Sequence, residues 1–114
     1  MYQVMVVDDE EYILKALKRT INTYTDWEVE TYQAPHEALR RARTTVFDAV
    51  ITDYMMPEMN GLELLQELRD LQPDTIRIVL TGVIDIETVM SAINKAGAFR
   101  FIPKPWDDDQ LLDN

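Results

Sequence analysis

The stretch that decides the fold is Tyr2-Gln-Val-Met-Val-Val7, which runs directly into the acidic sequence Asp8-Asp9-Glu10-Glu11. The run is short, apolar and rich in valine, and it stops abruptly at charged residues. This pattern is typical of a buried strand in a parallel sheet, whose carboxyl end opens to solvent. We therefore predict a strand over residues 2–7, with Asp8 and Asp9 at its carboxyl end.

The same alternation of strand and helix continues along the chain. Apolar residues at helical spacing predict a helix over Glu11–Tyr24, and Pro35 opens a second helix in the first-turn position that proline tolerates. Asn60 and Glu63 form a capping-box pattern at the start of a helix that ends near Leu71. Further strands are expected at residues 27–32, 46–52, 76–80 and 98–102, and further helices after Asp85 and Asp107, the last one cut short at Asn114.

Five strands that alternate with helices imply right-handed crossovers and a parallel sheet covered on both faces. We expect an α/β fold: a flavodoxin-like (βα)5 three-layer sandwich with the strand order 2-1-3-4-5. The chain has 114 residues, of which 46% are hydrophobic, and this suits one domain over residues 1–114.

Composition excludes several classes of function. The formal charge of −10, from 21 acidic and 11 basic residues, would repel nucleic acid, so we expect no direct nucleic acid binding. Zero cysteines exclude disulfides, thiolate metal sites and cysteine nucleophiles. No apolar run is long enough to cross a membrane, and no secretory signal is recognisable at the start, so we expect a cytoplasmic protein.

The chemically capable residues all follow predicted strands: Asp8, Asp9, Asp53, Thr81 and Lys104. Ends of neighbouring strands lie about 5 Å apart, so three carboxylates should converge in one crevice. Two like charges about 4 Å apart, at an effective dielectric constant of about 20, repel by about 4 kcal/mol, so the site calls for a cation.

Carboxylates without histidine or cysteine favour a hard divalent ion, Mg²⁺ or Mn²⁺. A hydroxyl at Thr81 and an ammonium at Lys104 suit the oxygens of a phosphoryl group, with Asp53 as the nucleophile. Each residue also has an ordinary structural interpretation, such as helix capping by Asp8 and Asp9. The convergence of four separate loops favours the joint site.

Four blocks of sequence resemble the motifs of response-regulator receiver domains, which act in two-component signalling. They are Val7-Asp-Asp-Glu10, Thr52-Asp-Tyr-Met-Met-Pro-Glu-Met-Asn-Gly61, Leu80-Thr-Gly82 and Ile102-Pro-Lys-Pro-Trp106. They occur in the family's order across nearly the whole chain, and the second block is highly specific. The resemblance implies a signalling switch rather than a turnover enzyme.

By this resemblance, Asp53 is the phosphoacceptor, and Thr81 and Lys104 contact the phosphoryl group. The resemblance also implies that the Lys104-Pro105 bond is cis, an isomer that only proline makes cheap. Four metal contacts are implied: Asp9 directly, Asp8 largely through metal-bound water, the Asp53 carboxylate and the backbone carbonyl of Met55.

The resemblance further implies a partner and a response. The phosphoryl donor would be a histidine kinase or a histidine phosphotransfer protein, because His36 lies far from every motif and is interpreted as a surface residue. Thr81 and Phe101 would be the switch residues. Phosphorylation would change the surface formed by the helix after Asp85, the strand 98–102 and the last helix, which is also a candidate dimer interface. That surface would control an output domain or a downstream effector, and any C-terminal output domain lies outside this chain.

Two rival functions remain open. A Mg²⁺-dependent aspartyl-phosphate hydrolase would share the chemistry, but the residue two after Asp53 is Met55 rather than a second acid. A receiver-like module that works without phosphorylation is the other rival, and the intact set of Asp8, Asp9, Thr81 and Lys104 argues against it.

Overall fold

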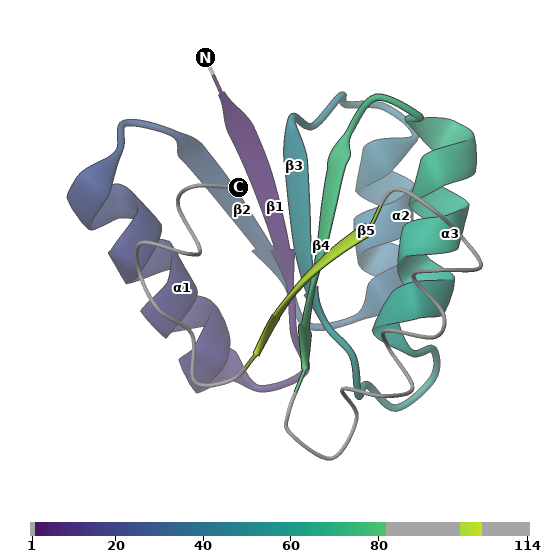
Figure 1. Ribbon diagram of the computed structural model, residues 1–114, viewed down its shortest axis with the longest axis horizontal. Helices are drawn as coiled ribbons and strands as arrows, with labels where there is room; N and C mark the ends of the chain where they lie inside the picture. The colour runs from purple at the N-terminus through teal and green to yellow at the C-terminus, as the bar shows by residue number, and fades with distance from the viewer. Residues whose placement is uncertain (1, 82–98, 104–114) are drawn as a thin grey trace.

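The computed structural model describes residues 2–81 and 99–103, whose strands form one parallel sheet. The strands are β1 (Gln3–Val7), β2 (Glu28–Tyr32), β3 (Ala49–Asp53), β4 (Ile76–Thr81) and β5 (Phe99–Pro103). They lie in the order β2-β1-β3-β4-β5 and every neighbouring pair is parallel (Figure 1). The predicted α/β fold and strand order are confirmed.

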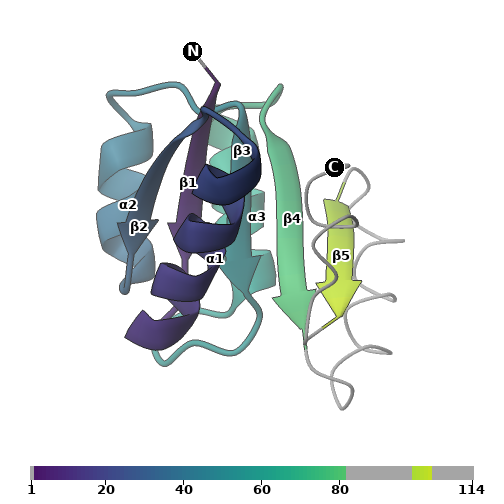
Figure 2. The same ribbon diagram turned by 90° about the vertical axis from the view of Figure 1, so that its left-hand side faces the viewer.

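Helices cover both faces of the sheet. The helix α1 (Glu11–Tyr24) lies on one face, and α2 (Pro35–Ala42) and α3 (Gly61–Leu71) lie together on the other (Figures 1 and 2). All three helices begin at the residues that the sequence predicts, and α1 and α3 also end where predicted. The helices expected after Asp85 and Asp107 lie outside the described residues.

Side chains alternate across the sheet and supply one apolar cluster to each face. In β1, Val4 and Val6 point toward α1, whereas Met5 and Val7 point toward α2 and α3. The cluster under α1 consists of Val4, Val6, Leu14, Leu17, Ile21, Ala49, Ile51, Ile78 and Leu80. The cluster under α2 and α3 consists of Met5, Val7, Ala38, Leu39, Ala42, Phe47, Val50, Met56, Leu62, Leu64, Leu65, Leu68 and Val79. Burial on both faces holds the central strands rigidly, which is what a site at their ends requires.

The third strand begins later than the apolar run suggests. We predicted a strand over 46–52, but β3 spans Ala49–Asp53 and Val46 is 77% exposed. Phe47 is buried, yet its backbone N–H donates to the side-chain Oε1 of Gln72 at 2.8 Å rather than to a neighbouring strand. A contact between residues far apart in sequence therefore replaces the ladder bond at this end.

The predicted capping box at the start of α3 is present. Asn60 Oδ1 accepts the Glu63 N–H at 2.9 Å, and Glu63 Oε1 accepts the Asn60 N–H at 3.3 Å. Such a cap stabilises a helix by about 1 kcal/mol. Because it anchors the first turn of α3, it also fixes where the loop that follows β3 must end. Within residues 2–81 and 99–103, no helix combines the length and the hydropathy that crossing a membrane would need.

Candidate functional site

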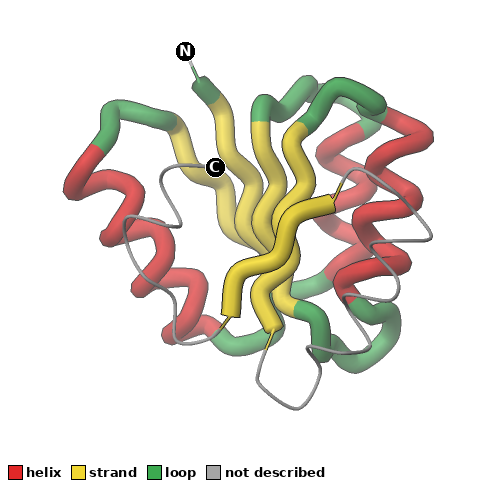
Figure 3. The backbone as a smooth tube through the Cα atoms, viewed as in Figure 1, coloured by secondary structure: helices red, strands yellow, loops and turns green. Residues whose placement is uncertain are grey.

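The carboxyl ends of β1 and β3 bring two buried acids together. The register pairs Val7 with Thr52. Asp8 and Asp53 each come one residue after this pair, on neighbouring chain segments. Asp8 has no exposed surface and Asp53 is 6% exposed. The loops that follow these strands lie at the same edge of the sheet (Figure 3). The ends of the first and third strands are therefore neighbours, as predicted. The carboxylates whose oxygens lie within 4.8 Å of one another are, however, those of Asp8, Asp9 and Glu10, and Asp53 is not in that group.

Two hydrogen bonds fix the position of Asp8, one through its backbone and one through its side chain. Its N–H donates to the carbonyl oxygen of Tyr32 at 3.1 Å, and its Oδ1 accepts the N–H of Glu10 at 2.9 Å. Glu10 itself is the N-cap of α1, and its side chain makes no capping hydrogen bond. The capping interpretation of Asp8 and Asp9 is therefore wrong, and Asp8 is positioned as a buried carboxylate at a strand end.

Three carboxylates gather at the start of α1. Oxygens of Asp8, Asp9 and Glu10 all lie within 4.8 Å of one another, with Asp8 buried and the other two exposed. Carboxylate oxygens at this spacing fit a hard divalent cation, which takes oxygen ligands and keeps several waters. Glu10 is part of the Val7–Glu10 motif, but it was not among the metal ligands predicted from the sequence. The folded structure shows that its carboxylate lies with those of Asp8 and Asp9.

The backbone of Asp53 is enclosed by the loop that follows it. The Tyr54 N–H donates to the carbonyl oxygen of Leu80 at 2.9 Å, and the Gly61 N–H donates to the carbonyl oxygen of Tyr54 at 2.8 Å. A Cβ on Gly61 would overlap the carbonyl oxygen of Asp53 and lie 3.1 Å from its carbonyl carbon. Only glycine permits this close approach, so Gly61 lets the loop return against the end of β3.

Methionines around Asp53 have different environments. Met56 is buried in the core under α2 and α3, and Met59 packs against the same core. The buried Thr52 hydroxyl donates to the carbonyl oxygen of Asp53 at 3.1 Å and lies 3.9 Å from Met56 Sδ. Met55, by contrast, is 62% exposed and lies two residues after Asp53 in the loop. Packing therefore explains Met56 and Met59, whereas the side chain of Met55 is open to solvent.

The model of the protein family described as "Response regulator receiver domain" matches residues 4–114 of the chain. This protein belongs to the response-regulator receiver domain family. The receiver is 36% identical over 110 residues to the hydrogenase transcriptional regulatory protein HoxA of Cupriavidus necator, across 96% of this chain and 22% of that protein. It is 37% identical to the transcriptional regulatory protein FixJ of Rhizobium meliloti, across 98% of this chain and 54% of that protein.

Solved structures agree with this assignment. A response regulator protein from Burkholderia pseudomallei is 31% identical, with a TM-score of 0.86 across 98% of this chain and 65% of that one. Its structure is described as containing a phosphorylated aspartic acid, a calcium ion and citrate. The chain therefore spans less than two thirds of the length of the HoxA and FixJ relatives. Receiver domains act in two-component signalling, interact with kinases and output domains, and typically bind Mg²⁺ at an acidic cluster.

The receiver's remaining predicted residues belong to β4, β5 and the segment after β5. Thr81 ends β4, one residue beyond Leu80, which pairs with Asp53, and Thr81 itself pairs with Pro103. Phe101 lies in β5, opposite Val79. These registers bring the backbone of Thr81 to the same edge as Asp53. Lys104 directly follows β5 and, with Pro105, lies outside the described residues.

His36 lies at the surface of the receiver, as predicted. It occupies the first turn of α2, its side chain is 58% exposed, and its Nδ1 lies 3.0 Å from Glu58 Oε2. Glu58 belongs to the loop between β3 and α3, so this contact joins α2 to the loop that encloses Asp53. His36 is not a member of the cluster formed by Asp8, Asp9 and Glu10.

Proposed function

We propose that this receiver takes a phosphoryl group onto Asp53 from a histidine kinase or a histidine phosphotransfer protein. The observation that carries the proposal is the pair of buried carboxylates, Asp8 and Asp53, at adjacent strand ends beside the Asp8, Asp9 and Glu10 cluster. Burying several carboxylates together is costly unless a cation accompanies them. A carboxylate that forms an acyl phosphate is an established type of nucleophile in proteins.

In the proposed transfer, a carboxylate oxygen of Asp53 attacks the phosphorus atom of a phosphohistidine. The P–N bond breaks as the new P–O bond forms, and the partner's imidazole leaves with the electron pair. Asp53 can act in this way because its backbone is held by Thr52, Leu80 and the close approach of Gly61.

Other residues would hold the cation and the phosphoryl oxygens. Asp8, Asp9, Asp53 and the Met55 carbonyl would hold Mg²⁺, or Mn²⁺ in its place, and the acidic cluster fits that donor set. When bound, the ion supplies positive charge that offsets the negative charge of the phosphoryl oxygens. Thr81 would donate its hydroxyl to one phosphoryl oxygen and Lys104 would place its ammonium beside another, with Pro105 orienting the lysine.

The proposal extends to what the receiver controls. The B. pseudomallei relative carries a phosphorylated aspartic acid and a calcium ion, which supports a phosphorylated acid beside a hard cation here. HoxA and FixJ are transcriptional regulators much longer than this chain. We infer that residues 1–114 are the receiver unit of a cytoplasmic regulator, and that Thr81 and Phe101 transmit phosphorylation to an output domain, an effector or a second copy.

The proposal is tested by mixing the protein with acetyl phosphate and Mg²⁺ and measuring intact mass and acetyl phosphate consumption. A receiver gains one phosphoryl group without sustained turnover. A hydrolase would consume acetyl phosphate continuously, and a module that works without phosphorylation would do neither. Asp53→Asn is the matched control, because it keeps the shape of the side chain and removes the nucleophile. Equal labelling of Asp53→Asn and the parent would overturn the assignment.

A further inference from the structure

A groove lies at the amino edge of the sheet, at the end of the domain opposite Asp53. Its residues come just before β1, between α2 and β3, and from the end of α3 to the start of β4, whereas Asp53 ends β3 (Figure 1). The groove has a volume of about 450 Å³. Six of its ten lining residues are apolar or aromatic: Tyr2, Val46, Phe47, Leu71, Pro73 and Ile76. We call this hollow the amino-edge groove.

Two apolar side chains of the amino-edge groove are open to solvent. Val46 is 77% exposed and Leu71 is 42% exposed. Exposed apolar surface that gathers in one place often marks an interaction site. A small-molecule pocket buries most of its ligand, but a groove whose wall is as exposed as Val46 is open along that side. Such an open, apolar groove suits a segment of another protein better than an enclosed small molecule.

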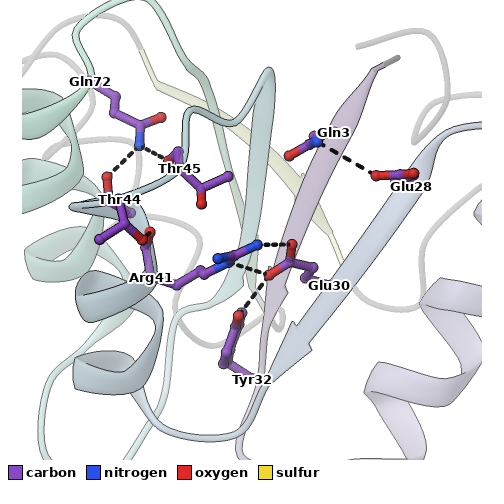
Figure 4. Close-up of polar contacts among 9 residues, drawn as sticks. Gln3, Glu28, Glu30, Tyr32, Arg41, Thr44, Thr45 and Gln72 are labelled. Carbon is purple, nitrogen blue, oxygen red and sulfur yellow. Dashed lines mark hydrogen bonds and ion pairs between the residues drawn. The ribbon is translucent and has the colours of Figure 1, made fainter.

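The polar groups at the floor of the amino-edge groove are already hydrogen-bonded within the domain. Gln72 Oε1 accepts the Phe47 N–H, and Gln72 Nε2 donates to the carbonyl oxygens of Ala42 and Thr45 (Figure 4). The Thr75 hydroxyl donates to the carbonyl oxygen of Phe47 at 2.8 Å. Because these side chains are engaged internally, the groove offers a ligand its apolar walls and its charged side chains.

The charged residues that line the amino-edge groove are both acidic. They are Asp48 and Asp74, and no basic residue is among the ten that line it. Asp48 is held in place because its Oδ2 accepts the Gln3 N–H at 2.8 Å. Burial and, after it, the negative charge of Asp48 raise the pKa of Tyr2, so this charge acts within the groove. The ion pairs recorded for residues 2–81 and 99–103 include neither aspartate.

The surface next to the amino-edge groove carries charge of the same sign. Leu71 also borders a smaller hollow of about 200 Å³, where Glu67 and Asp70 outnumber a single basic residue, Arg43. Opposite charges across an interface select the partner and speed its association, whereas like charges exclude it. A basic segment is therefore attracted along this surface and an acidic segment is repelled.

We propose that the amino-edge groove is a docking surface for a basic, amphipathic segment of a partner protein. Apolar side chains of the segment pack against Val46 and Leu71, and its lysine or arginine side chains lie beside Asp48 and Asp74. The apolar contacts supply most of the affinity, and the charges select the partner. Asp53 lies at the far end of β3, roughly 17 Å away for a strand of this length. Docking here is therefore independent of phosphorylation and does not rest on the proposed function.

The experiment uses the full chain and a synthetic peptide of alternating leucine and lysine. A leucine–glutamate peptide and a serine–lysine peptide of the same length are the controls. NMR titration should show the largest shifts at the amides of Val46, Asp48 and Thr75. The leucine–lysine peptide should bind at least about tenfold more tightly than either control, because only it matches both the walls and the charges. Equal binding of either control, no binding, or shifts confined to other elements would each overturn the proposal.

Variants of the groove separate specific docking from attraction by the net charge. Asp48→Asn combined with Asp74→Asn keeps the side-chain shapes and should weaken binding of the leucine–lysine peptide about tenfold. Glu11→Gln combined with Glu37→Gln changes the net charge equally at exposed positions outside the groove, and it should leave the affinity within about twofold. Val46→Gln should weaken binding about fivefold and keep the fold, because Val46 is mostly exposed.

Unchanged affinity in the double aspartate variant or in Val46→Gln would refute the docking surface, as would an equal loss in the double glutamate variant. Concentration-dependent shifts at the groove amides without peptide would show that a second copy of the chain occupies the groove, and would also refute it. Asp53→Asn should bind the peptide as the parent does, and a loss there would overturn the independence from phosphorylation. Acetyl phosphate labelling of the parent reports on Asp53 separately, so a failure there leaves the docking result readable.

Discussion

Replacing Gln72 with leucine should destabilise the domain strongly, because its buried side-chain amide joins three segments. Its Oε1 accepts the Phe47 N–H at 2.8 Å, and its Nε2 donates to the carbonyl oxygens of Ala42 at 2.7 Å and Thr45 at 2.6 Å. The Thr75 hydroxyl also donates to Oε1, at 3.0 Å. Figure 4 shows this amide reaching the segment that follows α2. No leucine can replace these bonds.

The magnitude follows from the groups that lose their partners. The Phe47 N–H and the Ala42 carbonyl are left in buried surroundings, at about 1–3 kcal/mol each. The Thr75 hydroxyl keeps its bond to the Phe47 carbonyl at 2.8 Å, and the half-buried Thr45 can reach water. Burial of the apolar leucine side chain stabilises the variant and offsets about 1 kcal/mol of this cost. The expected loss is therefore about 3 kcal/mol, or a fall in Tm of about 12 °C for a domain of this length.

Urea unfolding and thermal unfolding, both followed by circular dichroism, measure this loss. The matched control is Gln66→Leu, the same substitution at an exposed position of α3, the helix that Gln72 follows. It should change the free energy of unfolding by less than about 0.5 kcal/mol. A loss below about 1 kcal/mol for Gln72→Leu, or an equal loss in both variants, would refute the reasoning that this amide holds the segments together.

Three further predictions concern the site and the edge strand. Gly61→Ala should lower the free energy of unfolding by about 1–3 kcal/mol and slow the phosphorylation of Asp53, because a Cβ would push against the Asp53 carbonyl. Urea unfolding measures the first effect, and the intact mass followed over time with acetyl phosphate measures the second. Phosphorylation at the rate of the parent protein would contradict this prediction. Asp9→Asn should weaken Mg²⁺ binding at least about tenfold by calorimetry, and more than Glu10→Gln does, because Asp9, unlike Glu10, is proposed as a direct ligand. Equal losses in the two variants would contradict this difference. Burial and the bond to Glu30 raise the pKa of Tyr32 from 10.0 to about 12, so its contribution to stability is complete below pH 10 and is lost as pH rises from 10 to 12; absorbance titration should show that Tyr32→Phe removes the phenol that ionises last, and an unchanged titration curve would contradict the assignment.

The site was predictable from sequence to the extent that it depends on strand ends. Carboxyl ends of parallel strands meet at one edge, so an acid after the first strand and another after the third had to converge once the strand order was inferred. The buried positions of Asp8 and Asp53 agree with this reasoning. The placement of Lys104, which follows β5, depends on the same rule and stays a prediction.

The parts that sequence did not predict depend on contacts between distant residues. Phe47 continues an apolar run, and only the amide of Gln72, 25 residues away, shows why β3 starts later. The sequence predicts Gly61 as the first residue of a helix, which it is. Its close approach to the Asp53 carbonyl depends on how the loop after β3 folds and has no signal in the sequence. The bidentate bond between Glu30 and Arg41 joins a strand to a helix, and no spacing rule relates those two positions.

The most direct measurement locates the phosphoryl group itself. The protein is incubated with acetyl phosphate with or without Mg²⁺, treated with borohydride to reduce the acyl phosphate to homoserine, digested, and sequenced by tandem mass spectrometry. Homoserine at position 53 alone, and only in the sample with Mg²⁺, is the result expected of a carboxylate nucleophile beside a cation held by Asp8 and Asp9. Homoserine at another acid, or equal conversion of Asp53 without a divalent ion, would contradict it.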